Sequence, residues 1–224
     1  VPMLQPQVRE TIRNNTLGTM IVAQAAIAHQ ASAMVLISTD KAVNPTSMMG
    51  ISKRLAEMVV QLKDTEATTA FITVRFGNVL GSAGSVVPLF ERQIRNGGPV
   101  TVTDPEMTRY FMTISEACQL ILQACAIGKG GEIFVLNMGE PIKIDYLARQ
   151  MIRLSGKIPD DEVAIEYTGL RPGEKLTEEL FHSEESLAET QYEKILLAES
   201  RPLKVEGLVQ GLADIERACE AYEH

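Results

Sequence analysis

The sequence predicts an α/β fold, in which helices cover the faces of a parallel sheet. Two apolar runs, at 34–38 and 69–75, have the length of buried strands. A segment of helical length, 48–63, separates them, and strands that alternate with helices are typical of parallel sheets. After about residue 80 the polar connections become longer, so we expect a smaller second lobe made of the later segments.

The remaining elements follow in order along the chain. A helix over 7–29 precedes the first strand. We expect residues 1–80 to form the first domain and 81–224 mainly the second lobe, with the strand near 132–136 as a candidate to return to the sheet. Beyond the second strand, the sequence predicts helix 85–96, strand 100–102, helix 115–127, strand 132–136, helix 144–155, strand 163–167 and helix 205–222.

Composition and charge limit the possible functions. With 224 residues, of which 45% are hydrophobic, the chain is long enough for one substantial core and a smaller lobe. The formal net charge of −8 argues against a nucleic-acid partner, because phosphate binding needs clustered positive charge. No apolar run approaches the roughly 20 residues of a spanning helix, so we expect no membrane contact by this chain. The three histidines and three cysteines show no metal-ligand spacing, and we expect no metal site.

Polar side chains follow the first predicted strand where it ends. Residues 38–41 read Ser-Thr-Asp-Lys, and the next predicted helix carries Lys53 toward the same place. A hydroxyl, an acid and an amine together can move protons, so this strand end is a candidate catalytic edge. An ordinary strand-to-loop turn is the alternative, because Thr, Asp and Asn-Pro are also good turn formers.

Four ordered motifs carry a resemblance to a known family. They are Ser-Thr-Asp-Lys-Ala-Val-Asn-Pro-Thr at 38–46, Ser-Lys-Arg-Leu-Ala-Glu at 52–57, Arg-Phe-Gly-Asn-Val-Leu-Gly at 75–81 and Arg-Pro-Gly-Glu-Lys at 171–175. Together they resemble the CapD-like nucleotide-sugar 4,6-dehydratases of bacterial polysaccharide biosynthesis, which are extended short-chain dehydrogenases. The resemblance runs from about residue 1 to about residue 200. It implies a Rossmann-like sheet, NAD as cofactor and a UDP-sugar as substrate.

One expected motif is absent from the chain. A dinucleotide fold should open with a strand, a Gly-x-Gly-x-x-Gly turn and a helix, and no such sequence occurs here. The opening residues, Val1-Pro2-Met3-Leu4, resemble the middle of the family's cofactor domain. We therefore expect a C-terminal fragment with an incomplete Rossmann-like domain over 1–80, followed by a smaller α/β substrate-binding lobe.

Met49 departs from the usual pattern of short-chain dehydrogenases. The position four before the helix lysine is usually a tyrosine that moves a proton, and a thioether cannot do this. Within the resembling family, methionine is similar to the large, membrane-anchored branch, whereas tyrosine marks a small soluble branch that inverts the sugar at C5. The resemblance thus implies retention at C5, a cytoplasmic chain, and a parent anchored to the inner membrane by a missing N-terminal region. We treat Met49 as a marker of the catalytic site and not as a proton carrier.

The resemblance also assigns roles at the catalytic edge. A 4,6-dehydration takes hydride from C4 onto the cofactor, removes the C5 proton, expels the C6 hydroxyl as water and returns hydride to C6. The resemblance implies Lys41 as the base at C5 and Asp40 as the acid on the leaving oxygen. Thr39 is suited to hydrogen-bond the C4 oxygen, and the acceptor of the C4 hydroxyl proton stays open.

Lys53 has two interpretations. In the resembling family it would bind the ribose hydroxyls of the nicotinamide, and its charge could also lower the pKa of a neighbouring lysine. The alternative is a solvated lysine beside Arg54, on a helix face that also carries Glu57. Cofactor-binding candidates are Ser38, Lys53, Phe76 and Asn78.

Two arginines that are far apart in the sequence are the main candidates for binding the sugar nucleotide. Arg109 and Arg171 occupy the places where the resembling family clamps a pyrophosphate, which suits planar guanidinium groups. A single exposed arginine is otherwise usually a solvated charge. The acidic residues at 178–179 and 184–185 are interpreted as a solvated face. The substrate-binding candidates are Asn78, Ser85, Val86, Val100, Thr101, Arg109, Arg171 and Glu174.

Three hypotheses follow. The first is an NAD-dependent UDP-N-acetylglucosamine 4,6-dehydratase, a lyase that makes a 4-keto-6-deoxy sugar nucleotide for capsule, lipopolysaccharide or another surface glycan. The second is a nucleotide-sugar 4-epimerase of the same superfamily, which needs no acid at C6. The third is a UDP-sugar-binding fragment that is inactive without its N-terminal half. A homo-oligomer is expected in each case.

Overall fold

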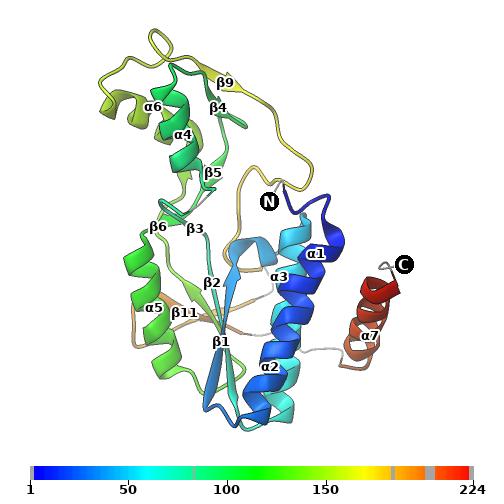
Figure 1. Cartoon of the computed structure of the whole chain (residues 1–224). Helices are drawn as coiled ribbons and strands as arrows, with labels where there is room; N and C mark the ends of the chain where they lie inside the picture. The colour runs from blue at the N-terminus through cyan, green and yellow to red at the C-terminus, as the bar shows by residue number, and fades with distance from the viewer. Residues whose placement is uncertain (1–2, 83, 183–184, 200–204, 222–224) are drawn as a thin grey trace. The chain divides into compact units, whose positions relative to one another are not determined.

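The computed structural model describes the chain except residues 1–2, 83, 183–184, 200–204 and 222–224 (Figure 1). It divides into two compact units. Unit 1 lies within residues 1–76, 120–137 and 179–224. Unit 2 comprises Gly77–Gln119 and Met138–Glu178.

Unit 1 contains a five-stranded sheet in the order β1-β2-β7-β11-β10. Strands β1 (Ala33–Thr39), β2 (Ala70–Phe76) and β7 (Ile133–Leu136) are parallel, which confirms the predicted α/β class. Strands β11 (Ile195–Ala198) and β10 (Leu187–Glu189) add two antiparallel partners at one edge, which the sequence did not predict. Both strands are three or four residues long, which gave no clear periodicity.

Helices cover both faces of this sheet. The predicted helix 7–29 is confirmed as α1 (Val8–Ile12), a π-helical turn and α2 (Gly18–Ala28). It lies with α3 (Met48–Glu66) on one face, and α5 (Ile114–Ile127) lies on the other (Figure 1). The packed core between α2, α3 and the first two strands is apolar; it contains Ala23, Leu36, Ala56, Val60 and Phe71.

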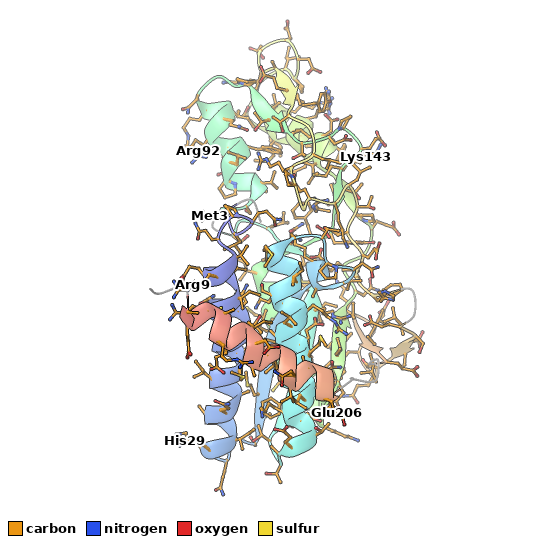
Figure 2. The ribbon with its side chains drawn as sticks, turned by 90° about the vertical axis from the view of Figure 1, so that its right-hand side faces the viewer. Met3, Arg9, His29, Arg92, Lys143 and Glu206 are labelled. Carbon is orange, nitrogen blue, oxygen red and sulfur yellow. The ribbon has the colours of Figure 1, made fainter. Side chains whose placement is uncertain are left out.

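The last described helix, α7 (Val205–Ala221), packs on the outside of this helical layer. Figure 2 shows that α7 starts near its labelled residue Glu206, passes in front of the helices of this layer, and runs toward the labelled Arg9 of α1. Leu208 and Leu212 pack against Val59 and Leu62 of α3. The expected helix 205–222 is therefore present as far as Ala221, and residue 222 lies outside the described part.

Unit 2 is smaller and is built around two amphipathic helices. Its apolar core joins α4 (Val86–Arg95), α6 (Ile144–Leu154) and β4 (Val100–Val102), which pairs in parallel with β9 (Ile165–Tyr167). Short two-residue strands complete it: β3 (Asn78–Val79) pairs with β6 (Phe111–Met112), and β5 (Thr108–Arg109) pairs with β8 (Ile142–Lys143).

The division between the units differs from the expected one beyond residue 120. Residues 120–137 and 179–224 belong to unit 1, because β7 and β11 extend its sheet and α7 packs on its helices. The interpretation of the acidic residues as a solvated face is wrong for Glu178 and Glu185, which are buried. Glu184 lies outside the described residues. Among the helices in the described ranges, none is long and apolar enough to cross a membrane.

Candidate active site

The catalytic edge of unit 1 forms where β1 and β2 end together. The parallel register places Ser38 opposite Arg75 and Thr39 opposite Phe76. After Thr39 the chain turns into one 3₁₀ turn, Asp40–Ala42. The Thr39 side-chain oxygen accepts the N–H of Lys41 at 3.4 Å and so caps this turn. The sequence therefore forms a turn as well as a cluster of polar groups.

Asp40 is the buried centre of this edge. Its side chain is wholly inaccessible, and its Oδ1 accepts hydrogen bonds from Thr39 Oγ1 and Lys41 Nζ, both at 2.9 Å. Its other oxygen, Oδ2, is also buried and has no hydrogen-bond partner among the described residues. A buried carboxylate oxygen without a donor is costly, so a donor supplied by a ligand would stabilise this arrangement.

Gly50 brings the start of α3 against the catalytic turn. A Cβ atom at Gly50 would lie 2.2 Å from the carbonyl oxygen of Lys41, a distance that no side chain can tolerate. Ser47 caps α3 by accepting the Gly50 N–H at 3.2 Å. The glycine between Met49 and the rest of the helix therefore fixes how closely α3 approaches Lys41. Met49 itself is partly exposed.

Lys53 reaches back to the first strand. Its Nζ donates to the carbonyl oxygen of Ile37 at 3.1 Å. Burial lowers the pKa of Lys53, and the charge of Glu57 opposes this effect. Glu57, which the alternative interpretation of Lys53 places on the same helix face, is fully buried.

Glu57 and Arg75 form a buried ion pair that the sequence reasoning missed. Burial by itself would raise the pKa of Glu57, but hydrogen bonds and charge from Arg75, with smaller effects from Ser38 and Arg54, outweigh it and lower that pKa. Burial likewise opposes the charge of Arg75, yet Glu57 and Glu185 raise its pKa. The available signal was an arginine at the end of an otherwise apolar strand, because a buried arginine needs a carboxylate partner.

In unit 2, Arg171 and Glu174 lie on one exposed turn. The Glu174 N–H donates to the carbonyl oxygen of Arg171 at 3.0 Å, and the Arg171 N–H donates to Glu174 Oε2 at 3.3 Å. Pro172 at the second position and Gly173 at φ +79° at the third fit a type II turn. The turn therefore displays the Arg171 side chain to solvent.

Arg109 is buried and is bonded to main-chain carbonyl groups. Its Nη1 donates to the carbonyl oxygens of Thr108 at 2.7 Å and Leu176 at 3.1 Å. Its Nη2 donates to Lys175 O at 2.9 Å, and its Nε lies 3.9 Å from Glu178 Oε1. Arg109 thus fastens the chain directly after the Arg-Pro-Gly-Glu turn.

The other unit 2 candidates differ in accessibility. Asn78, Ser85 and Val86 are partly exposed, and the Ser85 Oγ is a buried atom with no hydrogen-bond partner in the described structure. The N–H of Val100 donates to Ala164 O at 2.8 Å, and that of Thr101 donates to Gln93 Oε1 at 3.1 Å. The main-chain N–H groups of Val100 and Thr101 are therefore already used.

The predicted site residues are divided between the two units. Unit 2 holds the substrate candidates, including Asn78. Among the described residues, no group of three His, Cys, Asp or Glu could hold a metal ion. The catalytic edge in unit 1 contains Ser38, Thr39, Asp40, Lys41, Met49, Lys53 and Phe76.

Comparison with known proteins adds independent evidence. The family profile described as "Polysaccharide biosynthesis protein" matches residues 1–200. The capsular polysaccharide biosynthesis protein CapD of Staphylococcus aureus is 58% identical over 196 residues, which are 87% of this chain and 33% of that protein. A UDP-glucose 4-epimerase of Rickettsia typhi is 37% identical over 188 residues, 83% of this chain and 54% of that protein. The chain thus spans about a third to about a half of the length of these relatives.

Solved structures show the same fold. The X-ray structure of Pen from Bacillus thuringiensis is 39% identical with a TM-score of 0.76, and the match covers 83% of this chain and 58% of that one. DesIV, a dTDP-glucose 4,6-dehydratase from Streptomyces venezuelae solved with NAD and TYD bound, is 19% identical with a TM-score of 0.70, covering 89% of this chain and 64% of that one. These matches confirm the Rossmann-like fold class.

Proposed function

Because the chain belongs to the polysaccharide biosynthesis protein family, we propose that it carries the catalytic edge and the sugar-nucleotide-binding lobe of a UDP-N-acetylhexosamine 4,6-dehydratase. The hydrogen bonding of the Asp40 carboxylate is the observation that supports this proposal. One of its buried oxygens is bonded by Thr39 and Lys41, and the other has no donor among the described residues. A hydroxyl group of the sugar would be that donor, and it is the group that a dehydratase must expel.

NAD suits the groups present at this edge. When bound, NAD accepts hydride from C4 of the sugar and returns it to C6. The Lys53 ammonium, which already donates to the carbonyl of Ile37, is a suitable donor to ribose hydroxyl groups. Phe76 and Asn78 are the other proposed side-chain contacts, and Ser38 would contact NAD only through its main chain, because its hydroxyl donates to Glu57. No Gly-x-Gly-x-x-Gly turn occurs in these 224 residues. The residues that bind the diphosphate of NAD would therefore belong to a region that the relatives have outside the part matched by this chain.

The hydrogen bond between Thr39 and Asp40 suggests what takes the C4 hydroxyl proton. Met49 cannot accept it. Thr39 Oγ1 donates to Asp40 Oδ1, so Thr39 can accept the C4 proton while it passes its own proton to Asp40. Asp40 then protonates the C6 oxygen as the C5 proton moves to Lys41. The C4 proton and the C6 hydroxyl leave together as water, and Lys41 returns its proton to C5.

The same hydrogen bonds couple the two proton transfers. Thr39 Oγ1 and Lys41 Nζ both donate to Asp40 Oδ1 at 2.9 Å. A proton that reaches Asp40 from C4 through Thr39 therefore arrives at the atom to which the proposed base, Lys41, is bonded. The C4 and C5 steps thus use neighbouring atoms of one hydrogen-bond chain.

In unit 2 we assign the pyrophosphate to Arg171 and to the start of α4. The Arg171 guanidinium is exposed, and the unpartnered Ser85 Oγ lies with Val86 at the N-terminus of a ten-residue helix. Glu174 is the proposed acceptor for the uridine ribose. Arg109 donates to the main-chain carbonyls that follow the Arg171–Glu174 turn, so it holds this turn in place and does not itself bind the pyrophosphate.

A nucleotide-sugar 4-epimerase is the second candidate, because a protein of that name shares 37% identity with this chain. An epimerase also moves hydride at C4 but leaves the C6 hydroxyl in place. The product therefore distinguishes the two candidates more clearly than any one substitution.

The test follows UDP-N-acetylglucosamine and NAD with the full-length protein in D₂O by proton NMR. A C6 methyl signal with deuterium at C5 is expected, and its stereochemistry tests the retention implied by Met49. Asp40→Asn and Lys41→Met should abolish the methyl signal. A C4 epimer without a methyl group would favour the epimerase, and no product from any UDP-N-acetylhexosamine or UDP-hexose would refute both activities.

A further inference from the structure

A buried cluster of charges lies directly behind the catalytic edge. Arg75 is 1% exposed and Glu57 is inaccessible. Arg75 donates from Nε to Glu57 Oε1 and from Nη2 to Glu57 Oε2, both at 2.7 Å, which is a bidentate pair. The hydroxyl of Ser38 donates to the same Glu57 Oε1 at 2.6 Å. One carboxylate therefore bonds to residues near the ends of both β1 and β2.

The cluster joins four segments of unit 1. Ser38 and its register partner Arg75 are the last residues but one of β1 and β2, and Glu57 belongs to α3. Arg54, also of α3, donates to Glu57 Oε2 at 2.8 Å. Glu185, just before β10, accepts from Arg75 Nη1 at 2.8 Å. The two carboxylates and two guanidinium groups have opposite and equal charges, so the cluster carries no net charge.

Stability alone is a weak reason for such a cluster. Replacing a buried ion-pair network by apolar side chains of similar volume is often neutral or stabilising, because desolvation offsets the attraction. What the cluster fixes is geometry, since short bidentate bonds restrict both distance and direction. Charge supports the same view, because the lowered pKa of Glu57 keeps it a carboxylate.

The segments that Glu57 fixes are those that carry the proposed chemistry. Ser38 immediately precedes Thr39 and Asp40, so its hydroxyl bond to Glu57 sets the direction in which the strand enters the catalytic turn. Lys53 lies one helical turn before Glu57 on α3, on the same face. The strand that carries the proton-moving groups and the helix that carries Lys53 thus meet at one carboxylate.

We propose that Glu57, held by Arg75, is a positioning residue that aligns the Thr39–Lys41 turn with Lys53 through its hydrogen bond to Ser38. The proposal rests on the proposed function for the identity of the reaction, but the alignment itself does not depend on it. A merely structural ion pair would affect folding and leave the geometry of the turn and the rate of the chemical step unchanged once the protein is folded.

Ser38→Ala in the full-length protein tests the proposal, because it removes one hydrogen bond and leaves the Glu57–Arg75 pair intact. We expect kcat to fall about tenfold, as one lost positioning hydrogen bond of about 1.4 kcal/mol would give, with both KM values within about twofold of the original. Amide hydrogen exchange should become faster at Lys41 and Val43, whose N–H groups bond within the turn. Glu57→Gln, if it folds, should give the same pattern more strongly.

Thr11→Val is the matched control. Its side chain is also buried in unit 1, but its hydroxyl bonds to the carbonyl oxygens of Gln7 at 2.7 Å and Leu4 at 3.2 Å, just before the first helix. We expect this variant to change neither kcat nor exchange at the turn.

Two results would overturn the proposal. Unchanged turnover and unchanged exchange in Ser38→Ala would make the bond a satisfied buried hydroxyl and nothing more. A higher KM for NAD with unchanged exchange would make Ser38 a direct cofactor contact. If the original protein converts no UDP-sugar, the proposed function fails, and the exchange rates of Lys41 and Val43 alone decide on the alignment.

Discussion

Unit 1 and unit 2 hold their polar side chains in different ways. In unit 1, Asp40, Glu57 and Arg75 are buried and bond to other side chains. In unit 2, Arg109 bonds to main-chain carbonyls and Arg171 is exposed on a turn. Side-chain networks fix the proposed proton-moving groups of unit 1, whereas a turn displays the proposed anion-binding group of unit 2. Substitutions in unit 1 should therefore affect rate and folding, and those in unit 2 should affect substrate binding.

The largest effect is expected from Asp40→Asn. An amide cannot pass a proton to the C6 oxygen, and general acid–base groups typically contribute 10²- to 10⁴-fold, so kcat should fall by about that factor with little change in KM. Steady-state kinetics of the full-length protein measure this. Asp161→Asn removes an exposed carboxylate of unit 2 and should leave kcat unchanged. A large rise in KM at unchanged kcat would place Asp40 in binding and remove the contrast between the units.

The next largest effect is expected on stability, when a buried arginine of unit 1 and a partly exposed arginine of unit 2 are each replaced by methionine. Arg75→Met leaves Glu57 and Glu185 as buried charges without their partner, which should cost roughly 3–5 kcal/mol of unfolding free energy. Arg149→Met breaks pairs with Asp145 and Asp160 in unit 2, where the side chain is 29% exposed, and should cost about 1 kcal/mol or less. Urea unfolding of the chain measures both. Equal losses would contradict the difference between the units.

Arg171→Ala tests the opposite expectation in unit 2. Loss of a charge-assisted bond to a phosphate should cost about 1.5–3 kcal/mol, a rise in KM of roughly 10- to 150-fold at nearly constant kcat. Arg153→Ala, which removes another exposed cation of unit 2, is the control and should change neither parameter. If kcat falls and KM does not, Arg171 acts in the chemical step and the proposed division of roles is incorrect.

Gly50→Ala tests how closely α3 approaches the catalytic turn. The new Cβ would lie 2.2 Å from the Lys41 carbonyl oxygen, which belongs to the main chain and cannot swing away. Such overpacking should cost about 1–3 kcal/mol of stability. Gly207→Ala in α7 meets no atom within 4 Å and should instead stabilise by roughly 0.5–1 kcal/mol. The thermal midpoint should therefore fall for Gly50→Ala and rise for Gly207→Ala, and an unchanged or raised midpoint for Gly50→Ala would exclude the close contact.

The sequence predicted unit 1 best where local signals agree with the fold. Strands at 34–38 and 69–75 and the helix between them are apolar or amphipathic along their whole length, so periodicity alone identified them. The strands at 187–189 and 195–198 were missed, because a short antiparallel edge strand owes its conformation to its neighbour in the sheet. The same reason explains the two-residue strands of unit 2.

Partners of side chains were harder to predict than the residues themselves. The chain order shows that Asp40 and Lys41 are adjacent, but Glu57, Arg75 and Glu185 are separated by 18 and 110 residues. Only the folded sheet brings these three together. Glu185 was therefore interpreted as a solvated acid, although it is 6% exposed.

The smallest expected effect is a pH dependence that belongs to Glu57. Its pKa is lower in the folded state than the ordinary glutamate value of about 4.3, because Arg75, Ser38 and Arg54 together outweigh the opposing effect of burial. Above pH 4.3 the stabilisation is fully present. Below it the unfolded state binds the proton first, so stability falls as the pH drops toward the folded pKa, with a slope of up to about 1.4 kcal/mol per pH unit.

Urea unfolding of the chain between pH 7 and pH 3 measures this slope. Glu57→Gln should lose stability at pH 7 and show a shallower decline in acid, because the titrating group is gone. Glu193→Gln removes an exposed carboxyl of unit 1 and is the control, with a profile close to the original. A steeper decline in Glu57→Gln than in the original would mean that Glu57 is not held as a carboxylate. The buried cluster of unit 1 would then differ from the exposed groups of unit 2 in packing alone and not in charge.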